Sequence, residues 1–289
     1  MTGRISGTTR LLGLIGDPVA HSLSPAMHNA ALATLGEDYC YVPFPVASDR
    51  LATAVAGLAV IGVQGFNVTI PHKQAILPLL QHVDSRAAAV GAVNTVYRLP
   101  EGGWAGTNTD IDGFLHPLIS LGLKGIPTLV LGSGGAARAV IQGCLEGGLQ
   151  PLRVAGRSPQ KLAELQKTWP QIQVLPWVEL DPYLAQTQLL INTTPIGMKA
   201  GSNAHSPTAS PLSREQLRLL PAGAIVYDLI YVPDPTPLLR MAAELGHTPI
   251  TGLEMLVQQG AKALSLWLGG KPVPIAVMRQ AAQQQLAQS

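Results

Sequence analysis

Short apolar runs alternate with longer stretches of helical composition along the whole chain. Such runs, bounded by turn residues, predict buried strands, and the longer stretches between them predict helices. Ser24-Pro25 opens the first helical stretch, because proline is favoured at the first position of a helix. This alternation predicts an α/β unit in the first part of the chain. Its expected strands cover residues 11–15, 39–46, 63–70 and 94–98, and its expected helices begin at Ser24, Ser48 and Asp84.

The same alternation begins again at Pro127, after a turn at residues 99–103 and a linking helix at residues 111–121. A strand–helix alternation predicts a parallel, doubly wound sheet for this second unit. The stretch 199–211 is rich in Gly, Ser, Asn and Pro, which predicts an exposed loop. The expected strands are 128–131, 152–155, 188–191 and 225–229, and the expected helices are 136–146, one from Ser158, 253–268 and 275–287.

Composition narrows the class of protein. A chain of 289 residues suggests about two domains, and 47% hydrophobic against 12% charged residues predicts a folded globular protein. The net charge of +2, without a basic cluster, gives no case for nucleic acid or a membrane surface, so we expect a small-molecule substrate. Cys40 and Cys144 have no metal-type spacing, and no apolar run resembles a signal peptide or a membrane span. We therefore expect a cytoplasmic protein, either a monomer or a homodimer.

A glycine-rich turn follows the expected strand at residues 128–131. Gly132-Ser133-Gly134-Gly135-Ala136-Ala137 fits the dinucleotide-binding pattern G-x-G-x-x-A and opens a helix. The first glycine permits a tight turn, the second lets a pyrophosphate approach the backbone, and the alanine permits close packing of helix on sheet. Ordinary turn glycines would explain one or two of these residues, but not their place between a strand and a helix. The motif predicts a dinucleotide at this helix N-terminus.

The next strand indicates which dinucleotide is bound. An enzyme that uses NAD usually has Asp or Glu at this point, whereas this chain has Arg157 and Ser158, with Lys161 one helical turn later. A guanidinium group suits a 2′-phosphate, to which Ser158 and Lys161 can add a hydroxyl and a second cation. We predict NADP as the cofactor. For Lys161 alone, a solvated helix face is an almost equal explanation.

Polar residues gather at the expected strand ends of the first unit. Ser22 and Ser24 can offer hydroxyl groups to a carboxylate, although Ser24 taken alone is better explained as a helix cap. Lys73 follows an apolar strand, where its amine can reach a ligand, although most lysines are only solvated. Asp110 could likewise be only a helix cap. None of these residues is informative by itself.

Together these segments resemble the shikimate dehydrogenase family. The substrate-side pattern reads Gly16-Asp17-Pro18-Val19-Ala20-His21-Ser22-Leu23-Ser24-Pro25-Ala26-Met27-His28-Asn29. The resemblance covers nearly the whole chain, and chance agreement of every segment in the same order is very improbable. The other matching segments, in order, are residues 67–73, 91–95, 108–110, 132–138, 191–198 and 252–259.

The resemblance implies the NADP-dependent, reversible reduction of 3-dehydroshikimate to shikimate, in the pathway to chorismate and the aromatic amino acids. It implies a substrate domain of residues 1–110 with 254–289, an NADP-binding Rossmann domain of residues 111–253, and a cleft between them. Lys73 would be the general acid and base, paired with Asp110. Ser22 and Ser24 would hold the substrate carboxylate. The ring hydroxyls would be held by Thr69, Asn94, Asp110 and Gln259, with Tyr231 near the substrate.

On the cofactor side, the resemblance adds Met198, Gly252 and Met255 to the glycine-rich turn. Ordinary packing explains both methionines almost equally well. The chain departs from the family at Gly156, where the family often has asparagine, and the histidines form no metal constellation. Two alternatives stay open: a quinate or quinate/shikimate dehydrogenase, which Ser22, Ser24 and Arg157 disfavour, and a non-catalytic NADP or metabolite sensor, which Lys73 and Asp110 disfavour.

Overall fold

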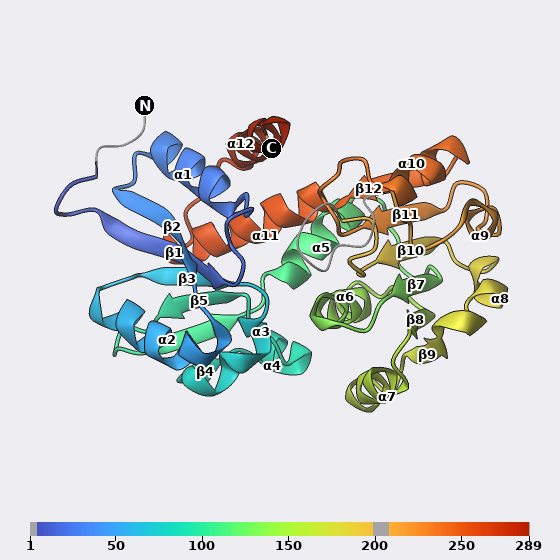
Figure 1. Ribbon diagram of the computed structural model, residues 1–289, viewed down its shortest axis with the longest axis horizontal. Coiled ribbons are helices and arrows are strands. Elements are labelled where there is room, and N and C mark those ends of the chain that lie inside the picture. Colours follow the sequence, from blue (N-terminus) through green and yellow to red (C-terminus); the bar gives the residue numbers. More distant parts are fainter. Residues whose placement is uncertain (1–4, 199–207, 289) are drawn as a thin grey trace. The chain divides into compact units, whose positions relative to one another are not determined.

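The computed structural model describes residues 5–198 and 208–288 (Figure 1). The chain forms two compact units, Met1–Gly113 with Leu256–Ser289, and Phe114–Met255. It leaves the first unit within α5 (Asp110–Ile119) and returns to it within α11 (Gly252–Trp267). The first unit is therefore built from two separate segments of the sequence.

The first unit contains a mixed six-stranded sheet in the order β2-β1-β3-β5-β6-β4. Strand β1 runs parallel to both β2 and β3, whereas β3, β5 and β6 are successively antiparallel. Helix α1 packs against α12 and β2, and α2 buries Leu51, Val55 and Leu58 in a core that contains Phe66 and Trp104. The strands are β1 (Arg10–Gly16), β2 (Tyr39–Pro45), β3 (Gly65–Val68), β4 (His82–Val83), β5 (Thr95–Arg98) and β6 (Trp104–Thr107). The helices are α1 (Ser24–Leu35), α2 (Leu51–Val60), α3 (His72–Ala75), α4 (Ser85–Val90) and α12 (Ile275–Ala287).

The second unit contains a six-stranded sheet in the order β12-β11-β10-β7-β8-β9, and every neighbouring pair is parallel. The strand order reverses between β7 and β10, which confirms the predicted doubly wound sheet. The strands are β7 (Thr128–Leu131), β8 (Leu152–Gly156), β9 (Gln173–Pro176), β10 (Leu189–Asn192), β11 (Ile225–Asp228) and β12 (Thr248–Thr251). The helices are α6 (Gly135–Glu146), α7 (Pro159–Thr168), α8 (Asp181–Leu184), α9 (Arg214–Leu217) and α10 (Pro237–Glu244).

Alternation along the central strands of this sheet gives it two buried faces. In β7, Val130 belongs to one hydrophobic cluster, while Leu129 and Leu131 belong to another. In β10, Ile191 faces the first cluster and Leu190 the second. Because successive side chains in a strand point to opposite faces, four-residue apolar strands are enough to bury both sides of a parallel sheet.

Several expected elements differ from the structure. The expected strand at residues 63–70 is only Gly65–Val68, and the short strands β4, β6, β9 and β12 were not predicted. The apolar pattern of two to four residues in these strands is too short to identify a strand without its neighbours. Of the expected loop at residues 199–211, residues 199–207 lie outside the described part, and residues 208–211 contain no helix or strand. None of the described helices combines the length and the apolar composition that crossing a membrane requires.

Trp267, at the end of α11, joins the C-terminal segment to the first sheet. Its indole N–H donates to the backbone oxygen of Val96 on β5 at 2.9 Å. The indole also lies directly over Gly65, where a Cβ would come within 2.2 Å of the Trp267 nitrogen. Gly65 is therefore required by the packing of this indole against β3.

We expect Gly65→Ala to lower the free energy of unfolding by about 1–3 kcal/mol, because overpacking forces the indole to move. Gly57→Ala is the matched control, since a Cβ at Gly57 in α2 would meet no heavy atom within 4 Å. Alanine there should keep or raise stability. Chemical denaturation of the two variants measures both effects, and equal stability of both variants would show that Trp267 adapts freely.

His28 is fully buried, and its ring stacks on Tyr41 with 4.2 Å between ring centroids. Neither ring nitrogen has a hydrogen-bond partner among the described residues, and burial lowers the pKa of His28 to about 3. The unfolded chain takes up a proton below about pH 6.5. Between that pH and about pH 3, the unfolded state alone carries this proton, so stability falls as the pH falls.

We expect this histidine to contribute a loss of about 1.4 kcal/mol in the free energy of unfolding per pH unit, between about pH 6 and about pH 4. The measurement compares denaturation curves of the wild type with those of His28→Leu, which cannot titrate. The variant should lose less stability on acidification, and parallel losses in the two proteins would contradict a neutral buried histidine.

Candidate active site

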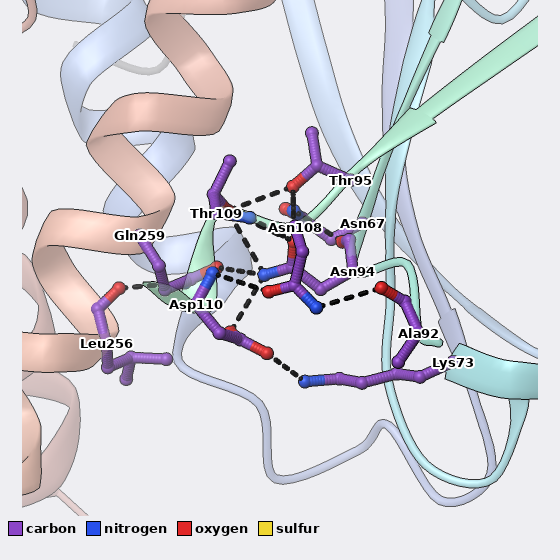
Figure 2. Close-up of polar contacts among 10 residues, drawn as sticks. All are labelled: Asn67, Lys73, Ala92, Asn94, Thr95, Asn108, Thr109, Asp110, Leu256 and Gln259. Atoms are coloured by element: carbon purple, nitrogen blue, oxygen red, sulfur yellow. Dashed lines mark hydrogen bonds and ion pairs between the residues drawn. The ribbon is translucent and has the colours of Figure 1, made fainter. Parts of the chain in front are cut away.

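Lys73 and Asp110 form an ion pair at the end of the first sheet. Lys73 lies on α3, just after β3, and Asp110 is the first residue of α5, just after β6. The Lys73 Nζ and Asp110 Oδ2 atoms are 2.6 Å apart, and Figure 2 shows the two side chains pointing toward each other. The side chains keep 27% and 13% of their surface exposed, respectively. The pair is thus partly shielded from water but keeps some contact with it.

The Asp110 carboxylate is held at its second oxygen as well. Asn94 Nδ2 donates to Asp110 Oδ1 at 2.8 Å, so each carboxylate oxygen has its own donor. The Asp110 backbone N–H donates to Asn108 Oδ1 at 3.1 Å, and the Asn108 amide donates to the backbone oxygen of Ala92. These contacts fix the orientation of the carboxylate relative to the ammonium group.

Asn94 is the centre of this network and is itself buried. Its side-chain oxygen accepts a hydrogen bond from the Thr109 backbone N–H at 2.7 Å and another from the Thr95 hydroxyl at 3.1 Å. Its amide nitrogen also lies 3.3 Å from Gln259 Oε1 on α11 (Figure 2). The structure therefore brings together four of the residues singled out from sequence: Lys73, Asn94, Asp110 and Gln259.

A second set of buried polar residues supports Asn94, and the sequence had indicated no role for it. Asn67 Nδ2 donates to the Asn94 backbone oxygen and to the Thr95 hydroxyl, both at 3.1 Å. The Tyr41 hydroxyl donates to Asn67 Oδ1 at 2.8 Å. Burial raises the pKa of Tyr41 well above its usual range, and a hydrogen bond with Ser24 opposes this shift. The polar residue Asn67 within the apolar strand β3 was the one feature of the sequence that could have indicated this buried network.

Ser22 and Ser24 lie where the chain enters α1. The Ser24 backbone N–H donates to Ser22 Oγ at 3.2 Å, and Ser24 is buried while Ser22 is half-buried. Ser24 is not the helix cap, because Leu23 occupies the cap position and no side chain caps this helix. Thr69 is half-buried beside Gly16, whose Cβ would come within 2.3 Å of the Thr69 methyl.

The glycine-rich turn lies at the point where the second sheet reverses its strand order, after β7. Gly132 has a φ of +113°, and a Cβ there would lie 2.4 Å from Thr193 Oγ1. Only glycine combines this backbone conformation with this close approach. Among the residues that the structure describes, no heavy atom lies within 4 Å of where a Cβ at Gly134 or Gly135 would be, and Ser133 and Ala136 retain exposed surface. The N-terminus of α6 is therefore open to a ligand, as a pyrophosphate requires.

Arg157 follows β8 and is exposed, as is Lys161 on α7. Ser158 caps α7, because its hydroxyl accepts a hydrogen bond from the Lys161 backbone N–H at 3.4 Å. Arg157 and Lys161 thus carry two cations on either side of a helix N-terminus. That arrangement suits a phosphate monoester through charge-assisted hydrogen bonds.

The other predicted cofactor and substrate contacts of this unit follow β10, β11 and β12. Met198 is 40% exposed, and Tyr231 is partly buried, which raises its pKa. Met255 packs against the hydrophobic core, and a Cβ at Gly252 would lie 2.2 Å from the Leu229 backbone oxygen. Packing therefore accounts for Gly252 and for part of Met255. In the described part of the chain, no three His, Cys, Asp or Glu side chains gather as a metal site would require.

Family models match both ends of the chain. The shikimate dehydrogenase substrate-binding domain matches residues 14–96, and the shikimate 5′-dehydrogenase C-terminal domain matches residues 252–283. The chain is 79% identical to the shikimate dehydrogenase (NADP(+)) of Synechococcus sp. (strain JA-3-3Ab), over 100% of this chain and 98% of that protein. It is 51% identical to the corresponding protein of Microcystis aeruginosa (strain NIES-843 / IAM M-2473), over 96% of this chain and 97% of the relative.

Solved structures agree with these matches. The shikimate 5-dehydrogenase of Thermus thermophilus, in complex with NADP(H) and shikimate, superposes with a TM-score of 0.85 at 38% identity and covers 96% of this chain and 100% of its own. The quinate dehydrogenase of Corynebacterium glutamicum, in complex with NAD, gives a TM-score of 0.84 at 28% identity, over 96% of this chain and 99% of its own. With relatives this similar over the full length, the chain belongs to the shikimate dehydrogenase family.

Proposed function

We propose that the protein is an NADP-dependent oxidoreductase that interconverts 3-dehydroshikimate and shikimate. Full-length relatives named shikimate dehydrogenase (NADP(+)), at 51–79% identity, support the activity and the cofactor. The observation that carries the mechanism is the Lys73–Asp110 pair, with 2.6 Å between its charged atoms and both carboxylate oxygens held.

In this mechanism, Lys73 is the acid during reduction and the base during oxidation. When bound, NADPH supplies the hydride that reaches the carbonyl carbon of the substrate. The Lys73 ammonium group gives one proton to the carbonyl oxygen as the hydroxyl forms, and takes that proton back in the reverse direction. Asp110 stabilises the ammonium form and orients it, because its other oxygen is already fixed by Asn94.

The substrate carboxylate and ring hydroxyls are assigned to the polar residues that the family resemblance indicates. Ser22 and Ser24 bind the carboxylate through hydroxyl and backbone donors near the start of α1. Thr69, Asn94 and Gln259 bind ring hydroxyls, and Tyr231 contributes from the loop after β11. Buried amides with fixed partners suit this task, since they keep their donors aimed when the ligand is absent.

NADP is assigned to the edge of the second sheet. Gly132, Ser133, Gly134, Gly135 and Ala136 receive the pyrophosphate at the α6 N-terminus, and Arg157, Ser158 and Lys161 receive the 2′-phosphate. Met198, Gly252 and Met255 complete this site. We also infer that the enzyme works in the cytoplasm on small molecules, which its two free thiols, Cys40 and Cys144, support.

Lys73→Ala should lower kcat roughly 10²- to 10⁴-fold while changing the Kd for shikimate little, because it removes the proton donor but not the ring contacts. Initial rates with shikimate and quinate, each paired with NADP or NAD, together with shikimate calorimetry, measure this. Lys167→Ala is the control, since Lys167 is exposed in the last turn of α7. A variant that retains more than about a tenth of wild-type turnover would refute the role of Lys73.

Arg157→Ala should lower kcat/KM for NADP by roughly 10- to 100-fold and leave kcat/KM for NAD nearly unchanged, since a charge-assisted contact to the 2′-phosphate is lost. The exposed Arg240 on α10 provides the control variant Arg240→Ala. If both cofactors lose efficiency equally, Arg157 does not read the 2′-phosphate, and the preference for NADP has another origin.

A further inference from the structure

The carboxyl ends of five parallel strands in the second unit form one row across the sheet. The register pairs Ala155 with Leu131, Leu131 with Asn192, Asn192 with Asp228, and Asp228 with Thr251. The segments proposed to bind NADP, and the loop that bears Tyr231, all begin just after this row. Asn192 and Asp228, the two central polar members, are both completely buried.

Asp228 makes its side-chain contacts with the segments at the sheet edge. Its Oδ1 accepts hydrogen bonds from the Ile230 backbone N–H at 3.1 Å and from Asn192 Nδ2 at 2.9 Å. Its Oδ2 accepts one from the Thr236 hydroxyl at 2.7 Å. Thr236 in turn caps α10. One carboxylate thus accepts hydrogen bonds from both ends of the loop 229–236, and this loop carries Tyr231.

Asn192 holds the segment after β10 in a similar way. Its Oδ1 accepts hydrogen bonds from the Thr194 backbone N–H at 3.0 Å and from the Thr194 hydroxyl at 2.7 Å. The adjacent Thr193 hydroxyl donates to the Leu131 backbone oxygen and occupies the space beside Gly132. Contacts from Asp228 therefore lead, through Asn192, to the segment that bears Met198 and to the glycine-rich turn.

Burying this carboxylate costs free energy, and its hydrogen-bond partners show which segments it stabilises in return. No cation pairs with Asp228 in the part of the chain that the structure describes, and burial raises its pKa to about 6. A buried charge without a cation costs stability, so hydrogen bonds to the charged form must offset that cost. Those bonds go to Asn192 and to the 229–236 loop. They therefore stabilise the conformation of the loops at the edge of the sheet where the cofactor is proposed to bind.

We propose that Asp228 is a positioning residue whose carboxylate holds the 193–198 and 229–236 segments in the conformation that receives NADP. This inference rests on the proposed function, because it needs NADP to bind at this edge of the sheet. Asp228 itself is completely buried, so it acts through Asn192, Ile230 and Thr236 rather than by touching the cofactor.

Asp228→Asn tests the proposal, since asparagine has the same shape but lacks the charge and one acceptor. We expect its Kd for NADPH to rise about ten-fold, measured by NADPH fluorescence. Its Kd for shikimate, measured by calorimetry, should rise by a smaller factor, because Tyr231 is the one proposed substrate contact on the 229–236 loop. Thr236→Val should weaken NADPH binding in the same direction, and Thr236→Ser, which keeps the hydroxyl, should restore wild-type affinity.

A lower Tm for Asp228→Asn with an unchanged Kd for NADPH would overturn the proposal and leave Asp228 a purely structural role. If Asp228→Asn does not fold, the Thr236 pair decides: equal NADPH affinities of the valine and serine variants would overturn it. Failure of the wild type itself to bind NADPH would instead refute the proposed function, and the positioning role with it.

Discussion

The side-chain amide of Asn94 connects segments that lie far apart in the sequence. It binds the Thr109 backbone and the Asp110 carboxylate after β6, and it reaches Gln259 on α11. Its backbone oxygen holds Asn67 on β3. An amide can do this because it is donor and acceptor at once, and because a buried polar group must be satisfied or it costs stability. The orientation of Asp110, and through it of Lys73, therefore depends on this residue.

The second unit has a similar network of buried polar side chains at the edge of its own sheet. Asn192 and Asp228 stand at the ends of neighbouring buried strands, and their donors and acceptors are taken up by the loops that follow. In both units an amide and a carboxylate organise the polar loops that follow apolar strands. A buried apolar sheet thus gives the loops that follow it a defined starting geometry, which a binding site requires.

Local sequence was enough to predict the strands that form the centre of each sheet and the residues just beyond them. The glycine-rich turn at Gly132 and the basic residue Arg157 stood out from local pattern, whereas Lys73 and Asp110 were singled out only by the resemblance of the whole chain to a family. The contacts that fix these residues could not be predicted from local sequence, because the partners come from remote segments. Gln259 lies 165 positions from Asn94, and no pattern of apolar spacing encodes that contact. Strands such as β4 and β6 were missed for a related reason, since they are defined by pairing more than by composition.

Gly156, at the end of β8, packs closely against the glycine-rich turn. A Cβ at residue 156 would lie 3.1 Å from Ser133 Oγ and 3.0 Å from a Leu162 methyl carbon, so a side chain there would press on the glycine-rich turn. The missing side chain at Gly156 thus leaves the space that the Ser133 side chain fills. The Ser133 hydroxyl occupies the space beside residue 156, where a larger residue would have placed its own side chain. The polar group at this edge of the sheet therefore comes from Ser133 in the turn after β7, because residue 156 at the end of β8 has no side chain.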